Sequence, residues 1–244
     1  QNPPLQVRTG LLPQDMLVPS GLVLPENIKG VIGNLKIDTK NEDIIKLTTK
    51  ESYEEFFGLV KDEIQKECDS ICDGIKDVWF VPSPFMNVLM DADVYSGGKY
   101  NNFGIHGTGI ATAADSLAVI KKYIFEEKSI EKSALIDAVD SDFKDNAELL
   151  NLLRYNSPKL GNNDEYVDTI ATDLLDAFSK ALAGRVNCKG GIYRAGTGSA
   201  MCYLWHANEI GATPDGRRRG VTALIKASGA DLYDISASKL AFTV

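Results

Sequence analysis

The stretch GGKYNNFGIHGTGIATAADSLAVIKK, residues 97–122, decides the fold of this 244-residue chain. It predicts a short strand, a glycine-rich loop over residues 104–109, and a helix that begins near Asp115 as its N-cap and ends near Lys128. Glycine permits close backbone approach, and the helix N-terminus behind such a loop attracts anions. Two interpretations therefore stand here, a phosphate-binding loop and a purely structural turn.

The order of the glycines favours the structural turn. A dinucleotide site has the pattern G-x-G-x-x-G directly after a strand, with an acidic residue about twenty positions further on. Residues 104–109 have the order G-x-x-G-x-G, and the residues about twenty positions later are the charged end of the predicted helix.

Periodicity outside this stretch predicts a helix-rich α/β arrangement with too few strands to close a barrel within this chain. The longest apolar stripes fall in helices over residues 50–73 and from 162–164 to Gly184. The other expected elements are a strand at 78–85, a short turn or helix at 85–90, helices near 131–142 and 146–155, a strand-like segment at 190–206, and a turn at 211–220.

The chain divides into three parts by composition. Residues 1–48 are rich in proline and glycine and predict an extended arm, residues 49–227 form the α/β region, and residues 228–244 form a tail. The net charge of −8 argues against a nucleic-acid partner, since the basic run at 217–219 is too short to form a binding face. No run reaches the length of a membrane span, and the first residues lack a signal peptide's pattern.

Four cysteines in a chain of this size indicate reduced thiols and a cytoplasmic protein. Cys68 and Cys72 share one helix face and fall on or beside its apolar stripe, so buried thiols are favoured over half of a metal site. The two histidines, His106 and His206, stand far apart and make no metal site, and we expect no metal or bound cofactor. Asp91 and Asp93 are better explained by a solvated turn than by calcium ligation.

The aromatic residues Tyr193, Tyr203 and Trp205 fall on one face of a regular strand. That face is either a side of the core or a pocket wall, because Tyr and Trp join an apolar body to a polar tip.

Five segments, taken together and in order, resemble the glycyl radical enzymes of the pyruvate formate-lyase and diol-dehydratase type. They are GGKYNNFGIHGTGIATAADSLAVIKKYIFEEK (97–128), NSPKLGNNDEYVD (156–168), GGIYRAGTGSAMCYLWH (190–206), GATPDGRRRG (211–220) and GVTALIKA (220–227). The resemblance implies part of a ten-stranded α/β barrel with helices packed outside.

The resemblance places this chain between the family's two radical loops. One is the G-C-V-E type loop, which carries the thiyl cysteine, and the other is the R-V-x-G-Y loop, which carries the radical glycine; neither is present. Residues 184–191 look superficially like the glycine loop, but they precede the 211–217 turn and lack the following tyrosine. We therefore expect no catalytic residue in this chain, and the 1–25 and 228–244 ends have no counterpart in the family.

The family resemblance implies a substrate pocket and a partner. Tyr193 and Tyr203 match pocket tyrosines, and the nearby loop and strand add further candidates, which are Tyr100, Asn101, His106 and Trp205. A complete member carries a glycyl radical installed anaerobically by a radical-SAM activating enzyme.

Two functions remain open. The chain is either a section of a glycyl radical lyase, dehydratase or acyltransferase, or an inactive truncated paralogue that binds a ligand or partner. An isolated slice of a barrel exposes strand edges, so we expect a homo-oligomer or contact with the remainder of a larger chain.

Overall fold

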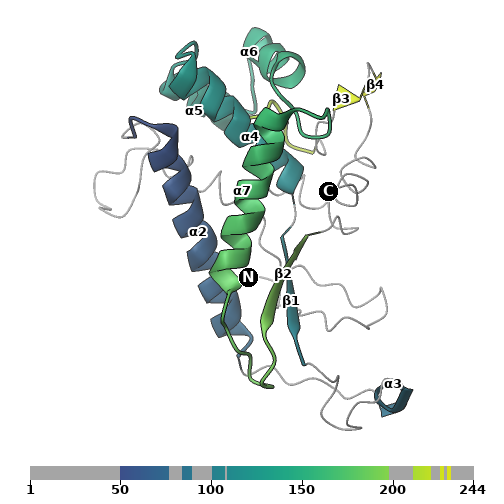
Figure 1. Cartoon of the computed structure of the whole chain (residues 1–244). Helices are drawn as coiled ribbons and strands as arrows, with labels where there is room; N and C mark the ends of the chain where they lie inside the picture. The colour runs from purple at the N-terminus through teal and green to yellow at the C-terminus, as the bar shows by residue number, and fades with distance from the viewer. Residues whose placement is uncertain are drawn as a thin grey trace.

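The computed structural model describes residues 50–76, 84–89, 101–107, 109–197, 211–220, 226–227 and 230–231 (Figure 1). The predicted arm at 1–48 lies outside these residues, as does most of the predicted strand at 78–85. Only residues 230–231 of the predicted tail are described. Across the described part, no helix is long and apolar enough to cross a membrane.

Two long helices form the body of the described structure, and both were predicted from their apolar stripes. α2 (Tyr53–Gly74) begins after Ser52, whose hydroxyl accepts a hydrogen bond from the backbone N–H of Glu55. α7 (Glu165–Leu182) begins after Asp164, whose carboxylate accepts one from the N–H of Tyr166. Figure 1 shows the two helices side by side, and their apolar stripes pack together.

The third major helix corrects the prediction made from Asp115. α4 (Ile110–Val119) begins after Gly109, which adopts the left-handed conformation with φ of 77°. Asp115 lies in the interior of this helix and is 1% exposed. Asp115 does not cap the helix because the helix begins five residues earlier, and its carboxylate accepts a hydrogen bond from the distant Leu160 N–H instead. The helix continues as the π-helix η2 (Ile120–Glu126), close to the predicted end.

The predicted glycine loop is also corrected, because most of it is a strand. β1 (Phe103–Gly107) pairs in parallel with β2 (Tyr193–Thr197), with Phe103 opposite Tyr193 and Gly107 opposite Thr197. A Cβ on Gly107 would lie 3.2 Å from Cε1 of Phe178 on α7. Gly107 thus lets the strand approach the helix, and glycine here reflects packing where a loop was expected.

The remaining described elements are short. The helices are α3 (Pro84–Leu89), α5 (Lys132–Asp140), α6 (Ala147–Asn151) and the π-helix η3 (Leu152–Asn156), and the strands β3 (Lys226–Ala227) and β4 (Ala230–Asp231) pair in antiparallel fashion. These helices match the predicted positions. The core lies among α2, α4, α7 and the β1–β2 pair, so the described part is helix-rich α/β as expected.

Candidate functional site

The β1–β2 pair has two unlike faces. On β1, Phe103 and Ile105 are buried toward the helices, whereas His106 is exposed on the opposite side. Parallel partners in register point to the same side, so Arg194, opposite Gly104, lies on the face of His106. Arg194 is exposed as well. The face away from the helices therefore carries both His106 and Arg194, two register positions apart.

Gly196 lies beside the ring of His106. A Cβ on this glycine would lie 3.8 Å from both Cε1 and Nε2 of His106, so the imidazole lies across the strand partner. The exposed imidazole of His106 therefore reaches over the neighbouring strand.

The predicted pocket residue Tyr193 lies on the other face of the pair. Its ring packs edge-on against Phe103, with centroids 5.8 Å apart and an interplanar angle of 81°, and it is only 7% exposed. Burial, together with nearby Cys72 and Cys188, raises the pKa of its phenol. The structure therefore separates Tyr193 from His106, and the two do not line one wall. Tyr100, Tyr203 and Trp205 lie outside the described residues.

Asn101 positions the start of β1. It adopts a left-handed backbone conformation with φ of 49°, and its carbonyl accepts a hydrogen bond of 2.7 Å from Nδ2 of Asn187. Oδ1 of Asn187 accepts bonds from the N–H groups of Lys189 and Gly191. Asn187 thus ties the turn before β2 to the turn before β1. Residues 184–191, the superficial match to a radical-glycine loop, form this structural turn.

Arg194 is a candidate site residue that the sequence analysis did not name. The signal was present in the alternation of the strand, because a buried Tyr193 places the next residue on the opposite face. Residues 104–107 belong to strand β1, and the successive N–H groups of an extended strand do not point at one anion. The structure therefore argues against the phosphate-loop interpretation of residues 104–109.

A second group of polar residues is fully buried and surrounds the turn at 211–217. Lys159 is 1% exposed, and its ammonium donates to the carbonyls of Leu153 at 2.8 Å and Asp215 at 2.9 Å and to Oγ of Ser157 at 2.7 Å. Arg217 is 3% exposed and donates from Nε to Oγ1 of Thr213 at 3.1 Å. The turn is thus held by side chains from the η3 end and from within itself.

Asp115 completes this buried group from helix α4. The N–H of Leu160 donates to its Oδ1 at 2.7 Å. Burial raises the pKa of Asp115 well above the usual carboxyl range and Asp215 adds to the rise, while Lys159 and the Leu160 hydrogen bond oppose it. The segment 157–160 therefore links α4 to the 211–217 turn.

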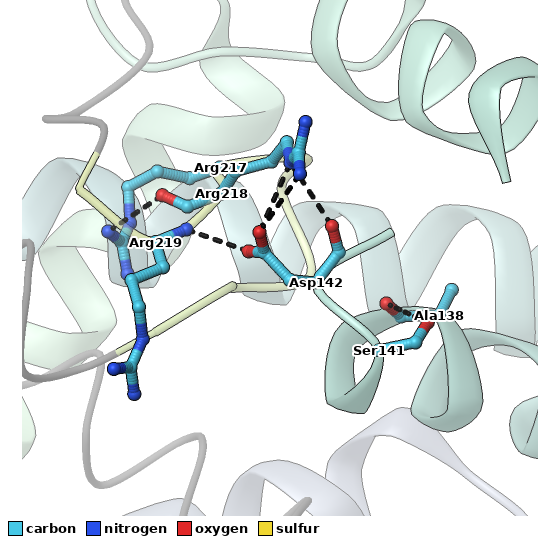
Figure 2. Close-up of polar contacts among 6 residues, drawn as sticks. All are labelled: Ala138, Ser141, Asp142, Arg217, Arg218 and Arg219. Atoms are coloured by element: carbon cyan, nitrogen blue, oxygen red, sulfur yellow. Dashed lines mark hydrogen bonds and ion pairs between the residues drawn. The ribbon is translucent and has the colours of Figure 1, made fainter. Parts of the chain in front are cut away.

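The outer side of the same turn is fixed by Asp142, as Figure 2 shows. Nε of Arg218 donates to Oδ2 of Asp142 at 3.2 Å, and the N–H of Arg219 donates to its Oδ1 at 2.8 Å. Asp142 itself adopts a left-handed backbone conformation, with φ of 54°. Arg217 and Arg218 thus hold this turn through their side chains, and Arg219 contributes its backbone N–H.

The cysteines of α2 are buried free thiols, as predicted. Cys68 is 0% and Cys72 9% exposed. Burial raises the pKa of Cys68 to about 12, and neighbouring Cys72 contributes to the rise while Arg185 opposes it. A thiol with so high a pKa is a poor nucleophile at neutral pH.

Comparison with known proteins gives the family. The family model described as "Pyruvate formate lyase-like" matches residues 36–207. The chain belongs to this pyruvate formate lyase-like family. The match covers the long helices, both strands of the parallel pair and the segment that follows them.

Relatives with curated names place the chain among the glycyl radical enzymes of this family. It is 32% identical over 179 residues to trans-4-hydroxy-L-proline dehydratase of Clostridioides difficile, covering 68% of this chain and 23% of that protein. It is 27% identical to (2S)-3-sulfopropanediol dehydratase of Klebsiella oxytoca, covering 71% of this chain and 22% of that protein. The chain thus spans less than a quarter of the length of these relatives.

Solved structures of the pyruvate formate lyase-like family agree. The structure of the B12-independent glycerol dehydratase from Clostridium butyricum covers 89% of this chain with a TM-score of 0.71 and 26% identity, and the match takes up 30% of that structure. The 1,2-propanediol dehydratase structure from Roseburia inulinivorans gives a TM-score of 0.70 at the same identity. The described elements therefore adopt the arrangement found in part of these barrel enzymes.

Proposed function

We propose that this chain is a section of a glycyl radical dehydratase or lyase, from the region between the thiyl-cysteine loop and the radical-glycine loop. The observation that carries the proposal is the structural likeness to glycerol dehydratase across 89% of the chain. The five ordered sequence segments and the family match over residues 36–207 support it. The ten-stranded barrel of the complete enzyme is part of this proposal.

The exposed β1–β2 face is the proposed substrate side. An imidazole at His106 and a guanidinium at Arg194 supply hydrogen bonds of the kind that orient a small hydroxylated or anionic molecule. Tyr100, Tyr203 and Trp205 remain proposed contributors to the same pocket. Tyr193 and Asn101 support this pocket without lining it. Tyr193 packs in the core on the other face of the strand pair, and Asn101 fixes the turn ahead of β1.

No radical step is assigned to residues of this chain. The two radical loops are missing from its sequence, and the look-alike segment at 184–191 is a turn that Asn187 holds. The complete enzyme would receive its glycyl radical from a radical-SAM activating enzyme in the anaerobic cytoplasm. Self-association or contact with the remainder of a larger chain would cover the edges of the strand pair.

An anaerobic turnover assay tests this proposal. The complete enzyme of this proposal, which contains this chain, is activated with a radical-SAM activating enzyme and offered glycerol, 1,2-propanediol and trans-4-hydroxy-L-proline. We expect elimination from at least one of them, and about tenfold slower turnover in His106→Gln, because one polar contact to substrate is worth roughly 1.4 kcal/mol.

The matched control is Asp62→Asn on the exposed side of α2, which should leave turnover unchanged. Full activity in His106→Gln would exclude the β1–β2 face as the substrate side. Absence of elimination from every compound in an activated protein would contradict the dehydratase or lyase assignment.

A further inference from the structure

The exposed face of the β1–β2 pair carries a guanidinium without a carboxylate on either strand. Neither β1 nor β2 contains an aspartate or a glutamate, although the whole chain has a net charge of −8. Arg194 lies opposite Gly104 on β1, and two positions further along His106 lies opposite a second glycine. Because the glycines contribute no side chain, these two registers present only the guanidinium and the imidazole on this face.

The side chain of Arg194 differs from those of other arginines in its partners. The guanidinium of Arg185 forms an ion pair with Asp69. That of Arg218 forms one with Asp142. Arg194 is exposed, and within the part of the chain that the structure describes no hydrogen bond or ion pair occupies its guanidinium. A group that only donates hydrogen bonds and always stays charged is thus left for a molecule that lies on this face.

Enclosure of this face in a barrel gives Arg194 a need for negative charge. This step rests on the proposed function, in which the complete enzyme encloses the β1–β2 face as its substrate side. Enclosure removes water from the guanidinium, and a buried charge is costly unless it is both paired and hydrogen-bonded. A neutral polyol accepts hydrogen bonds from a guanidinium but leaves its charge uncompensated. A substrate with an anionic group supplies the acceptors and the opposite charge together.

We propose that the substrate is a small hydroxylated acid, whose carboxylate or sulfonate group binds to Arg194. The planar guanidinium donates two parallel hydrogen bonds to such a group. Neighbouring strands lie about 4.8 Å apart and every second residue of a strand about 6.6 Å apart, so the backbones of Arg194 and His106 lie about 8 Å apart. One small molecule therefore reaches both side chains, with its anionic group at Arg194 and a hydroxyl toward His106.

Binding to the complete enzyme before its activation tests this inference without radical chemistry. Isothermal titration calorimetry compares 1,2-propanediol, the same diol with a sulfonate on its methyl carbon, and glycerate. We expect at least one of the two anions to bind about tenfold or more tightly than the neutral diol, and the tighter anion identifies the group as sulfonate or carboxylate. Arg194→Gln should weaken that anion by about tenfold or more and change the neutral diol by less than about twofold.

Two further variants test whether the guanidinium itself makes the contact. Arg194→Lys keeps the charge and loses the planar fork, so its affinity for the anion should fall between those of wild type and Arg194→Gln. Lys66→Gln removes a positive charge from the exposed side of α2, where Lys66 pairs with Glu63, and should leave anion binding unchanged. An equal loss in Lys66→Gln and Arg194→Gln would mean that net charge alone governs binding, and it would overturn the contact.

The outcomes separate this inference from the proposed function. Equal affinity of wild type for the neutral diol and for both anions would overturn the inference. So would unchanged anion binding in Arg194→Gln, which is the result expected if a carboxylate from the rest of the enzyme pairs with Arg194. Elimination from 1,2-propanediol by the activated enzyme alongside either result would leave the dehydratase or lyase proposal standing. Anion binding that depends on Arg194, without elimination from any compound, would support the inference and contradict that proposal.

Discussion

The glycines of this chain show how one residue type serves different needs at single positions. Gly184 and Gly216 both have a left-handed backbone, with φ of 73° and 89°. A Cβ on Gly184 would meet nothing within 4 Å, whereas a Cβ on Gly216 would lie 2.9 Å from the backbone nitrogen of Arg154. The first glycine is required by its conformation alone, and the second also by contact with η3.

Alanine substitutions at these two positions separate the effects. Gly184→Ala should lower the free energy of unfolding by about 1–2 kcal/mol through backbone strain. Gly216→Ala should cost a further 1–3 kcal/mol or so, because a backbone contact that short forces the turn away from η3. Urea unfolding measures both variants. Equal losses would mean that the 211–217 turn does not pack on η3 as closely as described.

At the same scale, Asp115 shows where local sequence reasoning fails. An aspartate ahead of an apolar run usually caps a helix, and the sequence carried no sign that Leu160 would supply its hydrogen-bond partner. Asp164 lies in the same kind of local context and does cap its helix. The difference is that α4 begins after the left-handed Gly109 and already contains Asp115, whereas α7 begins directly after Asp164.

Among the elements, those with a clear local sequence pattern were predicted correctly. The apolar stripes and N-caps of α2 and α7 predicted both helices within a few residues. β1 was missed in part because its glycines resemble a loop, although Gly107 is there to admit the ring of Phe178. The candidate site was half predicted, since His106 was named and Arg194 was overlooked.

Asp142, in the loop between α5 and α6, should protect the outer side of the 211–220 segment from proteolysis. Asp142→Ala removes the acceptor for Arg218 and Arg219 and leaves an alanine at a positive φ. A half-exposed ion pair contributes under about 1 kcal/mol, so the effect on global stability should be small. We expect instead several-fold faster cleavage by trypsin after Arg218 and Arg219, measured as a time course by mass spectrometry.

Two variants control that experiment. Asp142→Asn keeps an acceptor oxygen and tolerates the left-handed conformation, so its cleavage should stay near the wild-type rate. Asp145→Ala tests the strain alone, because Asp145 has φ of 62° in the same loop but holds neither arginine. Cleavage that rises equally in Asp142→Ala and Asp145→Ala would show that the carboxylate of Asp142 does not anchor the turn.

For the whole molecule, the described strands account for only a small part of a barrel. β1 and β2 pair with each other, and in the described residues no further strand joins either outer edge. Glycerol dehydratase, with which this chain shares its arrangement, has more than three times the matched length. The proposal that the chain works as a section of such an enzyme therefore requires further strands, from the rest of a longer protein, to complete the sheet around β1 and β2.

Intact mass and electron paramagnetic resonance of one anaerobic preparation test that proposal most directly. The protein is isolated without oxygen, treated with a radical-SAM activating enzyme and S-adenosylmethionine, and measured by both methods. The account predicts a glycyl doublet from a protein heavier than the 26.6 kDa of this chain. A mass near 26.6 kDa without a doublet would contradict the account and favour a non-catalytic binding protein.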